Sequence, residues 1–235
     1  MGVYWAEIAE KNQTERQIQF LKSLLKLTGY VLDLACGSGR HSIALNADGY
    51  RMVGLDASLR LLKIAKQHSQ DIAVVLGDIR FLPFKTGTFD ATVSVDTSFG
   101  YLSSEADDRV SLSEVRRVMP QEGLLIIDVF NREYLNLKSK GQNNSTKEKD
   151  YPSFSLQQKR TISDNGDWLY DLWTIRDKEN LQVRFFEHKV RLYGLDKLRS
   201  LLEGTGFRVN LVLGGYGAEK FGVESPRLIF MAVAE

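Results

Sequence analysis

One short stretch of the chain combines an acidic residue with two glycines in a spacing that suits a ligand site. In YVLDLACGSGRHS, which runs from Tyr30 to Ser42, a short apolar run ends in Asp33, and Gly37 and Gly39 follow. Glycine adopts backbone conformations that other residues avoid and leaves room for a ligand against the main chain. The apolar run suits a strand buried on both faces. The stretch therefore predicts a strand, a tight turn and a helix whose first N–H groups face a ligand.

Acidic residues also follow later apolar runs. Five aspartates fall at or near the ends of such runs: Asp33, Asp56, Asp78, Asp96 and Asp128. Parallel strands present their carboxyl ends at one edge of a sheet, and ligands of such sheets bind there. Any one of these aspartates is also a common helix cap or turn residue. Together they predict a shared polar site at one edge of a parallel sheet.

Two classes of cofactor fit a glycine turn between a strand and a helix. A nicotinamide or flavin dinucleotide favours a third glycine, and Ser42 stands at that position here. Asp56 can bind a ribose in either class and does not distinguish them. Asp33 does, because a carboxylate there repels a pyrophosphate but attracts an ammonium group. S-adenosylmethionine carries an ammonium group and a ribose but no phosphate, so the residues favour it.

Several stretches of the chain occur in a family-specific order. They are VLDLACGSGRHS, GLDAS, GDIRFLPF, FDATVSVDTSFGYL and GLLIIDVFN, with SPRLIFMA near the end. This series resembles the motifs of class I S-adenosylmethionine-dependent methyltransferases over nearly the whole chain. The resemblance implies S-adenosyl-L-methionine as the cofactor and methyl transfer by in-line displacement. Because this methyl donor is already activated, no dedicated catalytic base is assigned.

The resemblance implies a cofactor-binding set that extends from the first strand to the fourth. The methionine moiety lies over the glycine turn with its ammonium group near Asp33, and the ribose hydroxyls bind Asp56. The adenine lies between the residues after Asp56 and those at Asp78, and the methyl donor lies beside Asp96. The set comprises Asp33, Ala35, Cys36, Gly37, Gly39, His41, Asp56, Ala57, Ser58, Asp78, Ile79, Val95 and Asp96. For His41, a place on a helix surface is an equal alternative.

The methyl acceptor is expected where the fourth and fifth strands end. Tyr101 and Asn131 are the candidate substrate residues beside Asp96, although Tyr101 also fits an aromatic at the edge of the core. The loop TSFGY resembles a branch that includes amino-sugar N-methyltransferases, which implies a small-molecule amine or hydroxyl acceptor. An RNA or protein acceptor, an NAD(P)-dependent oxidoreductase and a noncatalytic cofactor-binding module remain alternatives.

Other kinds of site fit poorly. The loop after the fourth strand begins Asp96-Thr97-Ser98-Phe99 and lacks the Pro-Pro-aromatic sequence of enzymes that methylate planar nitrogens. Cys36 lies inside the cofactor turn, which is the wrong place for the thiolate of pyrimidine C5 enzymes. The three histidines, His41, His68 and His188, are scattered, so no metal site is expected.

An alternating framework of strands and helices must position these residues. Strands are predicted over 31–34, 51–55, 72–76, 89–95, 123–130, 208–213 and 227–234, with helices over 14–27, 40–47, 58–65, 107–119 and 195–203. Alternation of this kind gives right-handed crossovers and a parallel sheet. We therefore expect an α/β fold with a Rossmann-like, doubly wound, seven-stranded sheet, mostly parallel with an antiparallel last strand, plus an inserted small antiparallel sheet.

The insertion is expected over residues 131–193 of a single methyltransferase domain that spans residues 1–235. Residues 131–150 are polar and predict a loop or mobile cover. The runs 155–162, 168–176 and 182–193 predict antiparallel strands, with Asp164-Asn165-Gly166-Asp167 as a hairpin turn. This sheet can form a wall facing the substrate, a homodimer surface or a lid on the main sheet.

Composition limits the partners. A net charge of +1 from 31 basic and 30 acidic residues provides no overall field for a polyanion, so DNA is not expected. Cys36 is the only cysteine, which excludes an internal disulfide framework and a Cys-rich zinc site. Without a signal segment or an apolar run of about 18 residues, we expect a soluble, cytoplasmic protein with no membrane partner. The terminal aromatics Tyr4 and Trp5 are expected to pack on a core.

Overall fold

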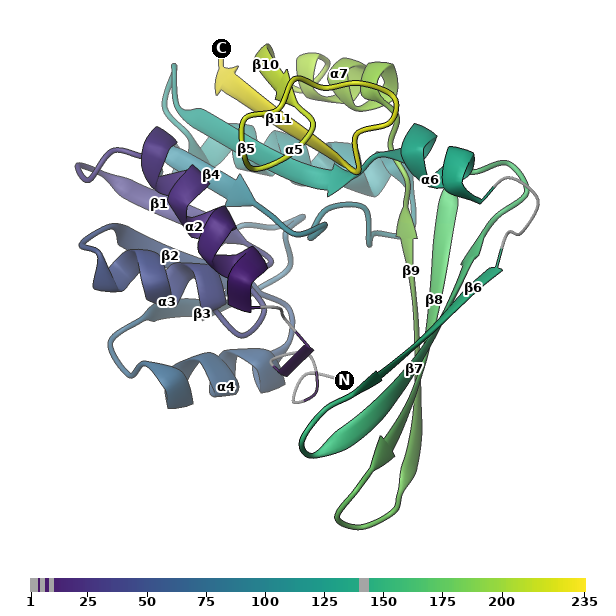
Figure 1. Ribbon diagram of the computed structural model, residues 1–235. Helices are drawn as coiled ribbons and strands as arrows, with labels where there is room; N and C mark the ends of the chain where they lie inside the picture. Colours follow the sequence, from purple (N-terminus) through teal and green to yellow (C-terminus); the bar gives the residue numbers. More distant parts are fainter. Residues whose placement is uncertain (1–3, 5–6, 9–10, 140–143) are drawn as a thin grey trace.

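The computed structural model describes residues 4, 7–8, 11–139 and 144–235. It contains a central sheet flanked by helices and a second, long sheet beside it (Figure 1). The central strands are β1 (Tyr30–Leu34), β2 (Arg51–Asp56), β3 (Ala73–Leu76), β4 (Ala91–Ser94), β5 (Leu124–Phe130), β10 (Phe207–Leu213) and β11 (Arg227–Ala234). The helices of eight or more residues are α2 (Lys11–Leu24), α3 (Arg40–Ala47), α4 (Leu59–His68), α5 (Glu105–Val118) and α7 (Leu195–Glu203).

The central sheet has the strand order β10-β11-β5-β4-β1-β2-β3. Strand β1 pairs in parallel with both β2 and β4, whereas β11 is antiparallel to its neighbours β5 and β10. The expected Rossmann-like sheet with an antiparallel last strand is therefore confirmed. The direction of winding reverses between β1 and β4, and ligands of such sheets bind at the carboxyl ends of the strands on either side of this point.

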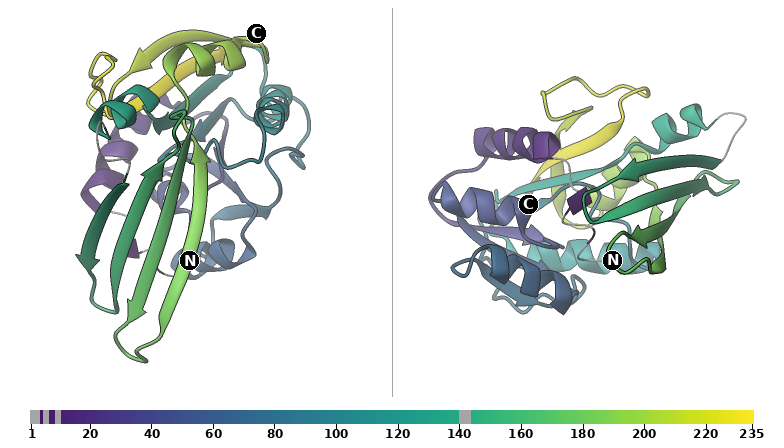
Figure 2. Two further views of the ribbon diagram at one scale, coloured as in Figure 1. Left: turned by 90° about the vertical axis from the view of Figure 1, so that its right-hand side faces the viewer. Right: turned by 60° about the horizontal axis from the view of Figure 1, so that its bottom comes forward.

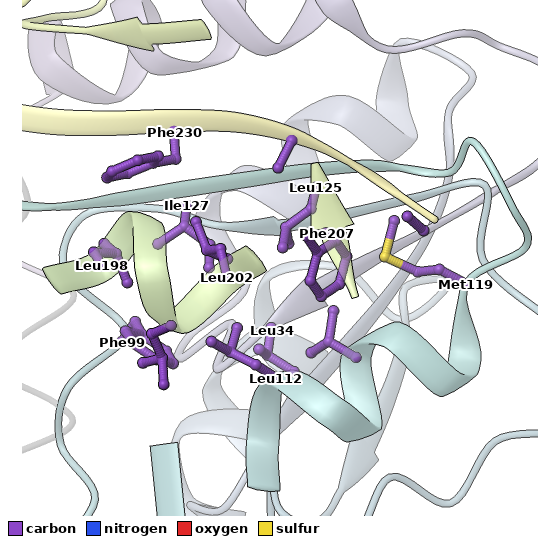
Figure 3. Packing of buried hydrophobic residues seen from close by; sticks show 14 of the residues in the cluster. Leu34, Phe99, Leu112, Met119, Leu125, Ile127, Leu198, Leu202, Phe207 and Phe230 are labelled. Carbon is purple, nitrogen blue, oxygen red and sulfur yellow. The ribbon is translucent and has the colours of Figure 1, made fainter. Parts of the chain in front are cut away.

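Alternate residues of the central strands face two separate layers of helices. Val31 belongs to the cluster that packs under α2 and α3, and its neighbour Leu32 belongs to the cluster under α5 and α7. Figure 3 shows the second cluster, in which Leu125 and Ile127 of β5 lie on the side of the sheet that faces Leu112 of α5 and Leu202 of α7. Burial on both faces explains why these strands are almost continuously apolar.

The second sheet has the order β6-β7-β8-β9 and is antiparallel throughout (Figure 2). Its strands are β6 (Asn144–Asp150), β7 (Phe154–Ile162), β8 (Trp168–Asp177) and β9 (Val183–Arg191). The three expected strands are present, and Gly166 takes a φ of +72° in the predicted hairpin turn between β7 and β8.

Two local predictions are wrong. Residues 131–150 were expected to be a loop, but they include helix α6 (Arg132–Lys138) and edge strand β6. A polar edge strand such as β6 forms through backbone pairing and needs no apolar face, so the sequence carries little signal for it. Residues 140–143 lie outside the described part. The helix predicted over 14–27 was placed too late in the chain, because α2 is already helical at Lys11 and ends at Leu24.

The N-terminal aromatic Tyr4 is buried, and its ring packs edge-on against Phe154 with centroids 4.9 Å apart. The expected packing is therefore confirmed for Tyr4, while Trp5 lies outside the described residues. In the described part of the chain, no helix has the length and apolar character needed to cross a membrane.

Candidate functional site

The glycine turn after β1 forms an open cradle. Ala35, Gly37 and Gly39 all have positive φ angles, of 59°, 59° and 74°. A Cβ atom placed on Gly37 would meet no atom within 4 Å, so this side of the turn is open. A Cβ on Gly39 would lie 3.2 Å from the Cβ of Ala65, so this glycine lets α3 and α4 approach each other. The two glycines therefore have different physical roles, because Gly37 leaves space for a ligand and Gly39 permits close packing.

Asp56 ties the end of β2 to this turn. Its Oδ2 atom accepts a hydrogen bond from the Gly37 N–H at 2.8 Å, and its Oδ1 atom accepts one from the Ser58 N–H at 2.7 Å. The Ser58 hydroxyl in turn caps α4 by accepting from the Leu61 N–H at 3.3 Å. Ala57 lies between these residues. The Asp56 carboxylate is thus fixed beside the cradle, and each of its oxygens keeps lone-pair capacity for a ligand.

Asp33 lies beneath the cradle and is 2% exposed. Its Oδ2 atom accepts a hydrogen bond from the Ser42 hydroxyl at 2.5 Å. Burial raises the pKa of the Asp33 carboxyl to about 6, against the opposing effects of the Ser42 hydrogen bond and the positive charge of Arg40. Ser42, which replaces the third glycine of the dinucleotide motif, therefore donates a hydrogen bond to Asp33.

A small cavity of about 50 Å³, called the donor cavity below, joins the cradle to the loop after β4. It brings together seven of the predicted cofactor residues, namely Asp33, Ala35, Cys36, Gly37, His41, Val95 and Asp96. The residues expected around the adenine do not line this cavity. Asp56 and Asp78 lie further along the same edge, because β2 pairs with β3 and the Gly77 N–H donates to the Asp56 carbonyl at 3.1 Å.

The carboxylate of Asp78 is bound by a neighbouring arginine. The Nε and Nη2 atoms of Arg80 donate to it at 2.6–3.1 Å, and Arg80 also pairs with Asp107 at 3.2 Å. The Arg80 hydrogen bonds hold the pKa of Asp78 below its ordinary value. The adjacent Ile79 packs against the core. Both oxygens of Asp78 already have a partner, so an adenine amino group would share them with Arg80.

The side chains of His41 and Cys36 are both buried. The His41 Nε2 atom lies 2.8 Å from the Gln17 Oε1 atom, and burial lowers the pKa of this imidazole well below its usual value. The alternative of a helix-surface histidine is therefore wrong. The Cys36 sulfur lies against Gly54, where a Cβ would come within 2.7 Å of it, and burial raises the pKa of the thiol. The Cys36 thiol therefore stays protonated at neutral pH.

Arg40 connects three elements at the edge of the donor cavity. Its Nη2 atom bonds to the Asp96 Oδ2 atom at 2.6 Å, and its Nη1 atom donates to Gln17 at 2.8 Å and to Thr14 at 2.5 Å. The Gln13 amide also donates to Asp96, at 3.1 Å. Helix α2, helix α3 and the loop after β4 are thereby held together around one ion pair.

A buried hydrogen-bond network supports the loop after β4. The fully buried Asp128 carboxylate receives two hydrogen bonds from Arg227, at 2.7 and 2.6 Å, one from the Tyr216 hydroxyl and one from the Asp96 N–H at 2.8 Å. Arg227 also donates to the Thr97 hydroxyl at 2.8 Å. Asp96 and Thr97 both have positive φ angles, which cost free energy outside glycine, and these bonds hold that conformation.

A larger cavity of about 320 Å³ lies between the carboxyl edge of the central sheet and the second sheet. It shares Arg40 and Asp96 with the donor cavity. Other lining residues include Thr97, Tyr101, Phe130 and Arg227 from the central part, and Gln158, Arg160, Leu169, Asp171, Trp173, His188 and Val190 from the second sheet. Tyr101, a predicted substrate residue, lines this cavity and lies 6.0 Å from the His188 ring.

A polar cluster on the second sheet centres on Asp171, which is 2% exposed. Its Oδ2 atom accepts from Gln158 at 2.6 Å and from Arg160 at 2.9 Å, and its Oδ1 atom accepts from the Trp173 indole at 2.8 Å. The His188 Nε2 atom lies 3.8 Å from the same carboxylate. Burial lowers the pKa of His188 despite the nearby Asp171 charge, so the imidazole is neutral at pH 7.

Asn131 does not reach this cavity. It is fully buried, and its amide nitrogen donates to the carbonyls of Val223 at 3.2 Å and Ser225 at 2.8 Å. Its Oδ1 atom accepts from the Glu133 N–H at 3.1 Å and so caps α6. The expected substrate contact at Asn131 is therefore wrong. Asparagine before a helix is a common N-cap, and that signal supports the structural role.

The sequence alone missed several residues that shape the two cavities. Arg40 directly follows the second glycine of the turn, and Gln17 lies within the helix predicted over 14–27, where its position indicates no contact with the turn. Asp171 interrupts the apolar run WLYDLW, where a buried charge is unusual and signals a partner. Arg227 pairs with the strand-end acid Asp128 at the antiparallel junction of β5 and β11, which only the strand order reveals.

Comparison with known proteins bears on this arrangement. Residues 31–123 match a family model described as a methyltransferase domain. This match and the relatives below support an S-adenosylmethionine-dependent methyltransferase. This methyltransferase is 28% identical over 218 residues to the Bacillus subtilis protein YqeM, which bears the name of a methyltransferase, over 91% of this chain and 87% of YqeM. It is 34% identical to a glycine/sarcosine N-methyltransferase of Parasynechococcus marenigrum, over 56% of this chain and 49% of that protein.

Solved structures share the fold of this methyltransferase. The CcbJ methyltransferase of Streptomyces caelestis superposes with a TM-score of 0.84 at 14% identity, over 97% of this chain and 92% of CcbJ. CalS10 from Micromonospora echinaspora, an amino pentose methyltransferase solved with S-adenosylmethionine bound, gives a TM-score of 0.71 at 14% identity, over 99% and 95% of the two chains. The cofactor of the family is S-adenosylmethionine. The matched residues 31–123 include the cradle, Asp56, Asp78 and Asp96, but not the second sheet.

Proposed function

We propose that this methyltransferase transfers the methyl group of S-adenosylmethionine to an amine or hydroxyl group of a small molecule held between the two sheets. One observation carries the proposal: the 320 Å³ cavity and the donor cavity share Arg40 and Asp96. Pockets for small ligands have volumes of about 300–1,000 Å³. A recessed space of this size suits a small molecule better than an RNA strand or a folded protein.

The residues around the cradle fit the cofactor. S-adenosylmethionine supplies a methyl group activated by its sulfonium. The Asp33 carboxylate would attract the ammonium group, and Asp56 would bind the ribose hydroxyls with the oxygens that now hold the turn. The open side of Gly37 leaves room for the methionine moiety against the main chain. Each charged hydrogen bond of this kind contributes about 1.5–3 kcal/mol.

The larger cavity would orient the acceptor and exclude water, and it would not supply a strong base. Phe130, Leu169, Trp173 and Val190 give it apolar walls, which exclude water from the reacting atoms. The neutral His188 and the hydroxyl of Tyr101 offer hydrogen bonds that orient an acceptor. Because the rate of in-line displacement depends on alignment, orientation by these side chains is the main contribution of the chain. The small-molecule names of the glycine/sarcosine and amino pentose enzymes support this choice.

Binding measurements test the cofactor assignment first. We expect purified protein to retain S-adenosylmethionine or S-adenosylhomocysteine, detected by mass spectrometry, and to bind S-adenosylhomocysteine in calorimetry. Release of NAD(P) instead would favour the oxidoreductase alternative and refute the proposal.

A labelled-methyl assay across metabolite, RNA and protein fractions tests the acceptor class. The expected product is a small molecule, and Asp96→Asn should lower its formation because Asp96 borders both cavities. The Asp71→Asn variant is the control, since Asp71 is exposed and lines neither cavity. Label appearing only in RNA or protein would contradict the proposal, and cofactor binding with no labelled product in any fraction would favour a noncatalytic module.

A further inference from the structure

We propose that the outer face of the second sheet binds the same face of a second copy of this chain, so that the protein forms a symmetric dimer. The second sheet projects from the central part of the molecule (Figure 1). Its inner face carries Asp171 and Trp173 into the wall of the larger cavity. Successive residues of a strand point to opposite faces, so the outer face lies on the other side of the sheet from this cavity. The dimer would therefore form whether or not the proposed function holds.

Apolar side chains stand on the outer face, where a sheet with one buried face normally carries polar ones. Tyr170 and Leu172 of β8 are each 38% exposed, and Phe185 of β9 is 68% exposed. Tyr170 and Leu172 are two positions apart on one strand. Phe185 lies two positions from Glu187, which pairs with Leu172. The three apolar side chains are therefore neighbours on one face and form an exposed patch, which marks a surface that binds another molecule.

One row of paired residues across the outer face carries opposite charges on the two sides of this patch. Lys159 of β7 pairs with Leu172, and Leu172 pairs with Glu187 of β9. Strands are about 4.8 Å apart, so the lysine and the glutamate stand about 10 Å from each other with the leucine between them. Both charged side chains are exposed, and in the described part of the chain neither has an ion-pair partner.

This row is complementary to itself under one kind of two-fold symmetry. Two sheets that pack face to face keep their strands within about 30° of each other. If the two-fold axis runs along β8, Leu172 faces Leu172 of the partner subunit, and Lys159 faces Glu187 of the partner subunit. If the axis runs across the strands, each lysine faces a lysine instead, and like charges oppose association. The charge pattern therefore selects the first arrangement, in which the same ion pair forms twice.

The area of this face suits a reversible dimer. Strand β8 has 10 residues. With a rise of about 3.4 Å per residue and four strands about 4.8 Å apart, the flat area is roughly 600 Å² per subunit. Two such faces bury about 1,200 Å², which is the lower limit for a specific interface. We therefore expect dissociation in the micromolar range.

The dimer would also support the wall of the larger cavity. On β8, Tyr170 and Leu172 of the outer face alternate with Asp171 and Trp173, which line the cavity. A partner packed on the outer face would restrain the strand that holds these two cavity residues.

Analytical ultracentrifugation of the full chain tests the proposal. We expect the wild-type protein to dimerise as its concentration rises through the micromolar range. Leu172→Lys, which places two ammonium groups against each other at the axis, should weaken dimerisation at least tenfold. Lys159→Glu should weaken it about tenfold, because the substitution acts twice across the axis. The charge-swapped variant Lys159→Glu/Glu187→Lys should restore dimerisation to within about threefold of wild type, since it exchanges the two members of each ion pair.

The matched control makes the same charge change away from the sheet. Lys63 of α4 is exposed, and Lys63→Glu should change dimerisation by less than twofold. Circular dichroism of each variant checks that the fold is unchanged. A wild-type protein that stays monomeric at about 0.1 mM, including one that associates only with a different protein, would overturn the proposal. So would a dimer that Leu172→Lys leaves intact, or a charge-swapped variant as weak as Lys159→Glu alone.

Discussion

The substitution Asp33→Asn tests whether the acid beneath the cradle is kept for the cofactor at the expense of stability. Asp33 is 2% exposed, and burial raises the pKa of its carboxyl to about 6 from the ordinary 3.8. At about 1.4 kcal/mol per pH unit, this difference corresponds to about 3 kcal/mol. The folded chain binds this proton more tightly than the unfolded chain does. The stability contributed by the group is therefore present below pH 3.8 and is lost as the pH rises through 6.

An amide at this position has no charge to desolvate, and it can still accept the hydrogen bond from Ser42. We expect Asp33→Asn to raise the free energy of unfolding of the cofactor-free protein by about 1–3 kcal/mol at pH 8, with the gain disappearing near pH 4. Urea unfolding at several pH values measures this. Asp71→Asn, which changes an exposed carboxylate, is the control and should show no such dependence.

The same substitution should weaken cofactor binding. Because an ammonium group attracts only the ionised carboxylate, the wild-type protein should bind S-adenosylhomocysteine about tenfold more weakly at pH 5 than at pH 7. In Asp33→Asn this pH dependence should be absent, and affinity at pH 7 should be at least tenfold lower. A variant that is no more stable at pH 8, or that binds with unchanged affinity, would refute the reasoning for Asp33.

Three further predictions concern the cradle and the network beneath it. Gly37→Ala and the control Gly87→Ala should each lower the free energy of unfolding by about 1 kcal/mol, because both glycines have a positive φ and open space at the Cβ position. Only Gly37→Ala should also weaken cofactor binding, measured by calorimetry. Asp56→Ala should lower cofactor affinity at least tenfold while the circular dichroism spectrum stays native, and near-normal binding would count against the ribose assignment. Asp128→Asn should destabilise the fold by about 3–5 kcal/mol, because it leaves the Arg227 charge buried without its carboxylate. In thermal unfolding, the double variant Asp128→Asn/Arg227→Met should recover part of that loss. If it recovers none, the broken ion pair is not the cause of the destabilisation.

The central sheet could be predicted from the sequence because its signals are local. Each strand is a short apolar run, and each is followed by an acid, a glycine or a helix cap such as Ser58, whose hydroxyl accepts from the Leu61 N–H. The predicted strand over 227–234 and helix over 195–203 match β11 and α7. Edge strand β6 escaped prediction because it is polar on both faces, and backbone pairing with β7 leaves no pattern in side-chain type.

The residues of the donor cavity could also be predicted from the sequence, because the residues of one turn lie close together along the chain. Asp33, Gly37 and His41 fall within nine positions and line one cavity. Asn131 was wrongly predicted to contact the substrate. It follows β5 at the correct edge of the sheet, but the Asn131 side chain turns into the core and caps α6. Position along a strand predicts the edge at which a residue lies, but it does not predict which way the side chain turns.

The acceptor side depends on contacts between distant segments, which a sequence pattern does not encode. Asp96 is followed by Thr97 in an unusual backbone conformation, and that conformation is held by Asp128 and Arg227, which lie 32 and 131 positions beyond Asp96 in the chain. Arg40 brings helix α2 onto the same loop through Gln17. The donor cavity and the larger cavity therefore meet at a loop whose shape depends on segments from across the whole chain. Because all of them contact the Asp96 loop, a change in any one should alter both cavities together. That coupling is the physical reason why cofactor and acceptor binding should be measured on the same variants.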